Sequence, residues 1–422
     1  MIKPSVPTPN HLRNMRISFI DHSFFPASVV ALLYYPANGG TNDPVENLER
    51  RTQLAKSLSE TLTLFYPIAG RYMKEDYSIN CNDDGVEYVE ALVDGELSQI
   101  LQGEVEAKEL NRFVPEEVEE SSTRPLIAIQ INIFNCGGLA IGFMYSHRIM
   151  DCFTFSMFIN GWAKIHKVGV NDVDIPDFES AGILFPAREL SWNKLPEITN
   201  SETVTKRFLF DAETISKLKA EAMSGCGFTY SQPSTVEVMT ALIWRAQINA
   251  IRARYGHLKT SMMSMPMNLR GRTFEKIPEN CCGNFFTMIN AKIPANDSKM
   301  GLNDFVDLVR DAIRNSITEF AQPSEGEDGF FSKVMKPFRE FFEELGKKDG
   351  DLILFSSWRH FPLYEVDFGW GKPAWVSFVQ SPYKGIVFID KKCGDGIEIW
   401  VTLDVEDMAH FQQDPNIINF SS

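Results

Sequence analysis

Hydrophobic positions recur at the spacing of a helix over residues 45–65. Leu54, Leu58 and Leu62 stand four residues apart, and Glu, Arg and Lys occupy the positions between them. Such a pattern predicts a helix with one apolar face. Pro67 follows the pattern closely, and a proline disfavours helical backbone in the residue before it. We therefore expect the helix to end just ahead of this proline.

The alternation over residues 127–133 predicts a β-strand instead. Every second residue there is isoleucine, with alanine, glutamine and asparagine between, so one face is apolar and the other is mixed. Residues 135–138, Asn-Cys-Gly-Gly, supply a turn, and residues 139–146 return as the partner strand of a hairpin. Apolar residues then fall at helical spacing over 155–165, which predicts a helix directly after the hairpin.

A polar stretch over residues 196–205 divides the chain. It contains Pro196 and little apolar periodicity, which is typical of a linker between domains. We therefore predict an N-terminal domain over 1–195 and a C-terminal domain over 206–422.

The second half of the chain also alternates strands and helices. Ser234 and Glu237 have the spacing of a capping box, which marks the start of a helix. The periodicity therefore predicts two α/β domains of similar size. Further strands are expected near 86–93, 261–267, 285–293, 352–356, 375–379, 386–390 and 397–403, and further helices near 302–320 and 331–345.

The composition is that of an ordinary globular protein. Of the 422 residues, 44% are hydrophobic and 23% are charged, with 41 basic against 56 acidic side chains for a net charge of −15. This acidic balance argues against nucleic acid and against anionic lipid as partners. The longest apolar stretch, 126–145, is interrupted by polar residues, so no membrane span is expected. The seven cysteines are scattered, which fits neither a disulfide framework nor a zinc site. We expect a reduced, cytoplasmic protein.

Familiar catalytic and phosphate-binding motifs are absent. The sequence has no G-x-S-x-G elbow, no Walker A loop, no H-E-x-x-H and no C-x-x-C. Residues 369–374 do match G-x-G-x-x-A, but they lead into the strand predicted at 375–379. A dinucleotide site needs a helix at that point, so this match is not interpreted as one.

His147 and Asp151 stand at the loop edge between the hairpin and the helix after it. Catalytic side chains concentrate in such loops. The ordinary pKa of histidine is near neutrality, so His147 can accept a proton at working pH. The spacing is weak evidence by itself, because His410 and Asp414 share it. A structural reading stays open, with His147 bonded to backbone and Asp151 as the N-cap of the helix.

A second feature strengthens the catalytic reading. The sequence Asp-Phe-Gly-Trp-Gly occupies residues 367–371, and His-Arg-Ile-Met-Asp occupies 147–151. Together these segments resemble the H-x-x-x-D and D-F-G-W-G motifs of the plant BAHD acyltransferases, which transfer an acyl group from a coenzyme A thioester to an alcohol or amine. The pattern is most similar to the vinorine-synthase-like clade, which acylates alkaloid hydroxyls. Supporting matches cover residues 54–59, 65–71, 268–270 and 283–284.

The resemblance implies a chloramphenicol-acetyltransferase-like fold of two mixed-sheet α/β domains with a solvent channel between them. In that fold His147 is the general base in the middle of the channel, and Asp367 is a second candidate catalytic residue. Asp151 is expected to pair with Arg270 and to position His147. The residues that hold the shape of the channel are Gly369, Trp370 and Gly371.

The resemblance also implies the substrates. The donor is acetyl-CoA or another short-chain acyl-CoA, and no metal is expected. Its phosphates need local positive charge in an acidic chain, and the stretch 245–276 supplies it. The candidate cofactor-binding residues are Arg252, Arg254, Ser234 and Asn284.

The acceptor is expected to be a neutral or cationic polycyclic alcohol, such as a monoterpenoid indole alkaloid. Family members that bind a carboxylate acceptor have an arginine where this chain has His360, with Arg359 displaced by one position. We expect a monomer whose only partners are these small molecules. Alternatives are a malonyl donor, a non-alkaloid or nitrogen acceptor, or a non-catalytic binding protein of the same fold.

Overall fold

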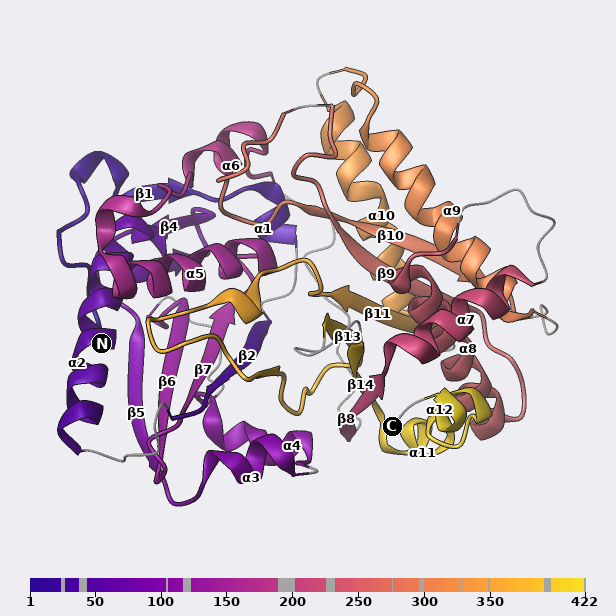
Figure 1. Ribbon diagram of the computed structural model, residues 1–422. Coiled ribbons are helices and arrows are strands. Elements are labelled where there is room, and N and C mark those ends of the chain that lie inside the picture. The colour runs from indigo at the N-terminus through magenta and orange to yellow at the C-terminus, as the bar shows by residue number, and fades with distance from the viewer. Residues whose placement is uncertain are drawn as a thin grey trace. The chain divides into compact units, whose positions relative to one another are not determined.

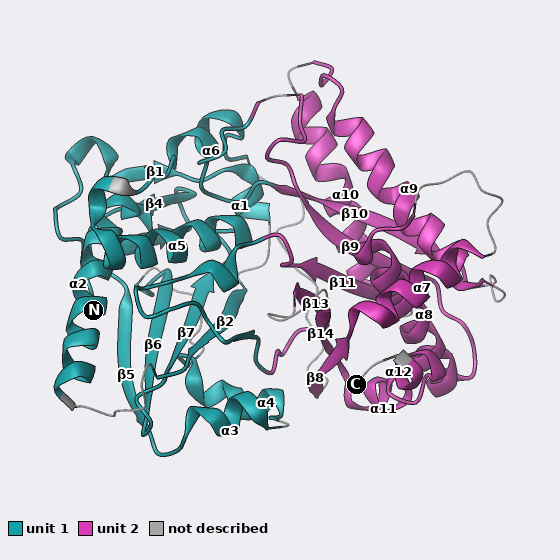
Figure 2. Ribbon diagram, viewed as in Figure 1, with its two compact units in different colours: residues 1–193, 277–285, 361–379 teal, residues 194–276, 286–360, 380–422 magenta. Residues whose placement is uncertain are grey.

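The computed structural model divides into two compact units (Figure 2). Unit 1 comprises residues 1–193, 277–285 and 361–379, and unit 2 comprises residues 194–276, 286–360 and 380–422. The residues that the structure describes are 1–23, 27–37, 44–103, 105–116, 123–188, 202–224, 232–274, 276–295, 300–326, 328–347, 350–390 and 396–420.

A five-stranded mixed sheet forms the centre of unit 1 (Figure 1). Its order is β12-β2-β7-β6-β5; β5 and β6 are parallel, and the other neighbours are antiparallel. The predicted hairpin is confirmed as β6 and β7, with Ile131 opposite Ile141. The bounds are β2 (Ser28–Tyr35), β5 (Glu87–Val93), β6 (Ile127–Phe134), β7 (Leu139–Ser146) and β12 (Trp375–Ser377).

Both faces of β6 are buried, which the alternation alone did not indicate. The segment that ends at Phe113 covers the mixed face. The polar side chains there bond to its backbone: Gln130 Nε2 donates to the Arg112 carbonyl at 2.9 Å, and Asn132 Nδ2 donates to the Phe113 carbonyl at 2.7 Å. A buried polar group is tolerated when it is bonded in this way. The strand is therefore a central core element.

Two long helices, α2 (Pro44–Leu64) and α5 (Cys152–Val168), pack against each other in unit 1. Both helices are predicted by the sequence. Trp162 of α5 is fully buried and donates to Ser57 Oγ of α2 at 3.0 Å. The remaining elements are α1 (Phe19–Ser23), α3 (Leu97–Gln102), α4 (Ala107–Leu110), α6 (Glu179–Leu184) and a small sheet of β1 (Asn14–Arg16), β4 (Ser78–Asn80) and β3 (Arg71–Met73).

Unit 2 is built on a six-stranded mixed sheet in the order β10-β9-β11-β13-β14-β8. The central strand β11 is parallel to both of its neighbours, and the other pairs are antiparallel. The strands are β8 (Thr203–Phe210), β9 (Ser261–Asn268), β10 (Phe286–Ile293), β11 (Asp351–Ser357), β13 (Gly385–Asp390) and β14 (Ile397–Asp404).

The helix α8 (Thr235–Tyr255) is the most buried helix of unit 2, and its predicted capping box is confirmed. Glu237 N donates to Ser234 Oγ at 3.2 Å, and Ser234 N donates to Glu237 Oε2 at 2.7 Å. Trp244 of α8 donates to Ser261 Oγ of β9 at 2.8 Å, which joins the helix to the sheet. The other helices are α7 (Ala212–Met223), α9 (Leu302–Phe320), α10 (Gly329–Leu345), α11 (Val405–Phe411) and α12 (Pro415–Phe420).

The two units are not contiguous in the chain. The segments 277–285 and 361–379 of the second half belong to unit 1, and β12 in the latter pairs with β2. Residues 203–205, the end of the predicted linker, begin β8, while residues 196–201 lie outside the described residues. The domain boundaries at 195 and 206 therefore stay a prediction. In the described ranges, no helix has the length and apolar character needed to cross a membrane.

Candidate active site

His147 occupies the turn between β7 and α5 in unit 1. Its backbone N–H donates to the Ala27 carbonyl at 3.0 Å, which continues the pairing of β7 with β2 by one residue. The side chain is partly buried, and its Nδ1 lies 3.1 Å from Asn284 Oδ1. The end of a rigid sheet thus places one imidazole nitrogen against an asparagine 137 positions away.

The orientation of the Asn284 amide is fixed by its other bonds. Asn284 is fully buried, and its Nδ2 donates to the His147 carbonyl at 2.7 Å and to Asp21 Oδ1 at 2.8 Å. Both partners accept only, so the NH₂ group must face them and Oδ1 must face His147. Because Oδ1 accepts, Nδ1 of His147 carries the proton. The lone pair of the neutral ring is therefore on Nε2.

Burial lowers the pKa of His147 from its ordinary value of 6.5, while bonds to its own backbone and to Asn284 and the nearby charge of Asp151 partly oppose the shift. The desolvation of the charged ring is the largest cause. A lowered pKa keeps the imidazole neutral at neutral pH. It is then ready to accept a proton.

Asp151 is the N-cap of α5, so the structural reading of this residue is confirmed. Its Oδ1 accepts from Thr154 N at 2.9 Å, and its Oδ2 accepts from Phe285 N at 3.1 Å. The carboxylate thereby joins the start of α5 to the segment that carries Asn284. Arg270 belongs to unit 2 and bonds to Asn268, so its predicted pairing with Asp151 stays a prediction.

The second motif forms a closed loop on the other end of α5. Asp367 Oδ1 accepts from Gly369 N at 2.8 Å and from Gly371 N at 2.9 Å, and Asp367 Oδ2 pairs with Lys167 Nζ at 2.6 Å. Although partial burial raises it, the Lys167 ammonium and the two glycine amides bring the pKa of Asp367 below its usual range. The two glycines have φ of +106° and +105°, where a side chain is strained.

Aromatic side chains of the loop 367–371 pack against α5. The Trp370 ring stacks on Phe368 with centroids 5.3 Å apart, and Phe368 meets Trp162 of α5 edge to face at 5.0 Å. The guanidinium of Arg50, on α2, lies 4.6 Å from the centre of the Trp370 ring. Gly369, Trp370 and Gly371 therefore belong to a packed loop within unit 1, and their predicted role in the shape of a channel stays a prediction.

The structure does not bring Asp367 and His147 together. His147 precedes the first residue of α5, and Asp367 is bonded near its last turn. The helix has 17 residues, which corresponds to a length of about 25 Å. A direct catalytic contact of Asp367 at the imidazole has no support in this geometry, because its carboxylate is used to close its own loop.

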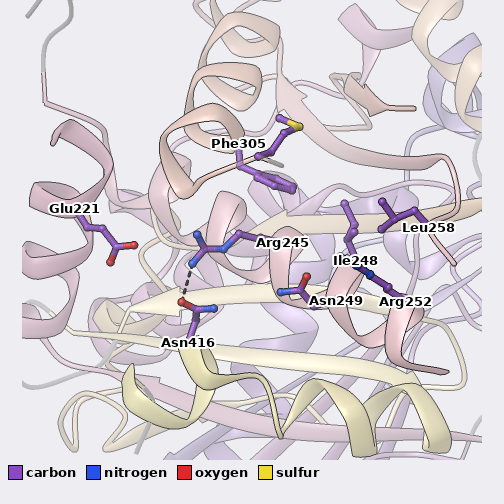
Figure 3. Close-up of a pocket in the computed structure, with 9 residues that line it drawn as sticks. Glu221, Arg245, Ile248, Asn249, Arg252, Leu258, Phe305 and Asn416 are labelled. Atoms are coloured by element: carbon purple, nitrogen blue, oxygen red, sulfur yellow. Dashed lines mark hydrogen bonds between the residues drawn. The ribbon is translucent and has the colours of Figure 1, made fainter. Parts of the chain in front are cut away.

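The predicted cofactor residues of unit 2 differ from one another. Arg254 pairs with three carboxylates, Asp404 at 3.8 Å, Glu406 at 2.6 Å and Asp407 at 2.9 Å, which offset its charge, and its predicted contact with a cofactor phosphate stays a prediction. Arg252 is exposed and lines a cavity of about 290 Å³ (Figure 3). The other residues around this cavity include Glu221, Arg245, Asn249, Phe305 and Asn416.

Three further predicted residues are placed as follows. The Ser234 hydroxyl is exposed and caps α8, as described above. Asn284 is fully buried and bonded to Asp21 and His147, so it supports the histidine and presents no surface to a cofactor. His360 is exposed in the turn after β11, and the neighbouring Arg359 forms an ion pair with Asp390. Among the described residues, no group of three His, Cys, Asp or Glu is placed to hold a metal ion.

Sequence reasoning missed the role of Asp21 altogether. Ser18 and Asp21 have the S-x-x-D spacing of a capping box, and the structure forms it: Asp21 N donates to Ser18 Oγ at 3.0 Å and Ser18 N donates to Asp21 Oδ2 at 2.8 Å. That local signal was readable. The bond from the other carboxylate oxygen to Asn284 was not, because 263 positions separate the two residues.

Comparison with known proteins gives consistent results over the whole chain. The model of the Transferase family matches residues 1–418. Acetyl-CoA-benzylalcohol acetyltransferase of Clarkia breweri is 37% identical over 432 residues, covering 100% of this chain and 98% of that protein. Vinorine synthase of Rauvolfia serpentina is 33% identical, covering 97% of this chain and 94% of that protein.

The fold agrees with these relatives. The crystal structure of vinorine synthase superposes with a TM-score of 0.83 at 30% identity, covering 100% of this chain and 97% of that structure. The predicted class of two mixed-sheet α/β domains is thereby confirmed. With both motifs in place and matches that span the chain, it belongs to the Transferase family of BAHD acyl-CoA-dependent acyltransferases.

Proposed function

We propose that the protein transfers an acetyl group from acetyl-CoA to a hydroxyl group of a plant specialised metabolite, with His147 as the general base. The observation that carries the proposal is the bond between His147 Nδ1 and Asn284 Oδ1, because it leaves the lone pair of the ring on Nε2. A base needs an unprotonated nitrogen towards its substrate.

The proposed reaction follows from the weakness of a neutral alcohol as a nucleophile. His147 Nε2 accepts the hydroxyl proton as the alcohol oxygen attacks the thioester carbonyl carbon. The carbon–sulfur bond then breaks, and the departing thiolate takes the proton from the imidazolium. The products are an acetyl ester and coenzyme A with a free thiol, and His147 returns to its starting state. No covalent acyl-enzyme is needed.

The choice of donor and acceptor is supported by the relatives. One relative is named for acetyl-CoA and benzyl alcohol, and another 33% identical protein is vinorine synthase. The exposed His360, in place of the arginine of carboxylate-binding members, favours a neutral or cationic acceptor. We propose an alcohol on an aromatic or polycyclic alkaloid skeleton. A malonyl donor or a non-alkaloid acceptor is the alternative, and Arg252, Arg254 and Ser234 are the candidates for contact with the cofactor.

The test is release of free thiol. Purified protein is incubated with acetyl-CoA or malonyl-CoA and a panel of alcohols that spans benzyl alcohol and indole alkaloids, and the ester is identified by mass. We expect turnover with acetyl-CoA that is abolished in His147→Ala. The matched control is His257→Ala, since His257 is exposed and its ring bonds to the local Tyr255 carbonyl. Unchanged turnover in His147→Ala would overturn the proposed base.

The pH profile adds an independent measurement. The active form of the base is the neutral ring, and burial lowers the pKa of His147 below 6.5. The value of kcat/KM should therefore rise with pH, level off at a pH below that expected of an ordinary histidine, and stay flat through neutrality. Binding of both substrates with no turnover at any pH would favour a non-catalytic protein of the same fold.

A further inference from the structure

Asp21 is a buried carboxylate with an unusual set of partners. It is 2% exposed, and all of its bonds come from neutral donors: Ser18 N and Ser18 Oγ on Oδ2, and Asn284 N and Asn284 Nδ2 on Oδ1. Among the described residues, no basic side chain forms an ion pair with it. An ionised group buried without a countercharge is costly for the fold.

This cost corresponds to a raised pKa. Burial raises the pKa of Asp21 from 3.8 to about 6, although the bonds from Ser18 and Asn284 lower it. A neutral acceptor would bond the Ser18 backbone with less desolvation. The Asp21 carboxylate therefore does more than cap the short helix α1. Its other oxygen, Oδ1, accepts from Asn284.

That other oxygen controls which way the Asn284 amide points. Oδ1 of Asp21 accepts from Nδ2, and the His147 carbonyl accepts from the same nitrogen. If the amide flipped, its oxygen would face both of these acceptors at about 2.8 Å and 2.7 Å, and its NH₂ would face His147 Nδ1. Two facing pairs of acceptors are repulsive, so the carboxylate and the carbonyl act together against the flip.

We propose that Asp21 is a positioning residue for the acyl transfer: its carboxylate holds the Asn284 amide so that Oδ1 faces His147 Nδ1, and thereby keeps the ring proton on Nδ1 and the accepting lone pair on Nε2. The inference rests on the proposed function of His147 as base. Asp21 itself exchanges no proton with the substrate. It acts through Asn284, across three segments of unit 1 that are far apart in the chain.

The size of the effect follows from the importance of the tautomer. In serine proteases, removing the carboxylate that orients the histidine lowers kcat by about 10⁴-fold without moving the residues, because the ring takes the wrong tautomer. Here the His147 carbonyl still favours the observed amide orientation when Asp21 is changed. The expected loss of kcat is therefore smaller, about ten-fold to a hundred-fold.

The test uses the full-length Asp21→Asn variant, in which one carboxamide oxygen cannot serve both Ser18 and Asn284. Nitrogen NMR of ¹⁵N-histidine-labelled protein, at about pH 8 where an ordinary histidine is neutral, reports which ring nitrogen carries the proton. The His147→Gln spectrum assigns the signal. In the wild type the proton should be on Nδ1, and in Asp21→Asn a substantial share should move to Nε2. The kcat should fall at least ten-fold, with the KM of either substrate changing less.

The control is Asp351→Asn. Asp351 is likewise buried, burial raises its pKa to about 6, and it bonds to Ser261 Oγ in unit 2. A loss of kcat in Asp21→Asn no greater than in this control, or an unchanged His147 tautomer, would overturn the proposal. The tautomer readout does not need turnover. If the tautomer shifts in Asp21→Asn but His147→Gln keeps full activity, the proposed base is wrong. The proposed effect of Asp21 on the His147 tautomer would then still stand.

Discussion

The two motifs of this chain lie at opposite ends of one helix and use their carboxylates differently. Near the start of α5, the buried Asp151 accepts from Phe285 N, and the buried Asp21 bonds to the neighbouring Asn284, which in turn bonds to the imidazole of His147. At the end of α5, Asp367 bonds to the amides of its own loop and to a half-exposed lysine. The first arrangement prepares a titratable nitrogen for chemistry. The second fixes the path of a loop that carries Trp370.

This comparison separates two ways in which a residue can be required for activity. Under the proposed mechanism, a change at His147 removes the base itself, while a change at Asp367 is expected to act through the packing of Trp370 and Phe368 on α5. The two kinds of loss are distinguished by measuring kcat and stability on the same variants.

The largest difference is expected between the kcat values of His147→Gln and Asp367→Asn. Loss of a general base lowers kcat by about 10²–10⁴-fold, and the glutamine keeps a polar side chain of similar size, so the melting temperature should change little. The asparagine at 367 still offers an oxygen to the Gly369 and Gly371 amides and loses only the pair with Lys167. Its kcat should fall less than about ten-fold. An equal loss of kcat in two folded variants would break the comparison.

An intermediate difference is expected between the losses of unfolding free energy in Asp151→Ala and Asp211→Ala. Both aspartates are N-caps, of α5 and α7 respectively, and loss of a cap costs about 1 kcal/mol. Asp151 also accepts from the buried Phe285 N, and an orphaned buried donor adds about 1–3 kcal/mol. Urea unfolding should therefore show a larger loss of stability for Asp151→Ala. Equal losses would mean that the Phe285 bond contributes nothing.

The smallest difference is expected between the losses of stability in Gly371→Ala and Gly256→Ala. An added Cβ at either position meets no atom within 4 Å, so only the backbone opposes the change. Gly256 has φ of +74°, near the left-handed region that other residues visit, whereas Gly371 has φ of +105°, outside it. Thermal unfolding should show a cost of about 1 kcal/mol at Gly256 and more at Gly371. The reverse order would argue that the second motif is not held by its backbone geometry.

Much of the secondary structure could be predicted from local patterns. The predicted helix over 302–320 coincides with α9, and the strand over 139–146 coincides with β7. The capping box at Ser234 formed as expected, because its two bonds join residues only three apart. Short apolar segments without clear periodicity, such as β2 and β8, were not recognised, since their burial depends on neighbours from distant parts of the chain.

The candidate site was predicted less completely. His147 and Asp151 stand out because a loop follows a buried strand and a helix begins beside it. The basic stretch suggested Arg254 as a phosphate ligand, but the fold brings three carboxylates to it, one from the end of β14 and two from α11. Local charge in a sequence does not show which opposite charges the fold will place beside it. For the same reason Asn284 was expected at a cofactor and is instead buried behind the histidine.

The sequence by itself determined the family and indicated His147 as the candidate base, because each motif is a local pattern within a few residues. The tertiary structure decided what each polar group does. The bonds from Asp21 to Asn284 and from Asn284 to His147 cross 263 and 137 positions, and no periodicity encodes such a distance. Only the folded chain removes water from these groups and brings their hydrogen-bond partners together.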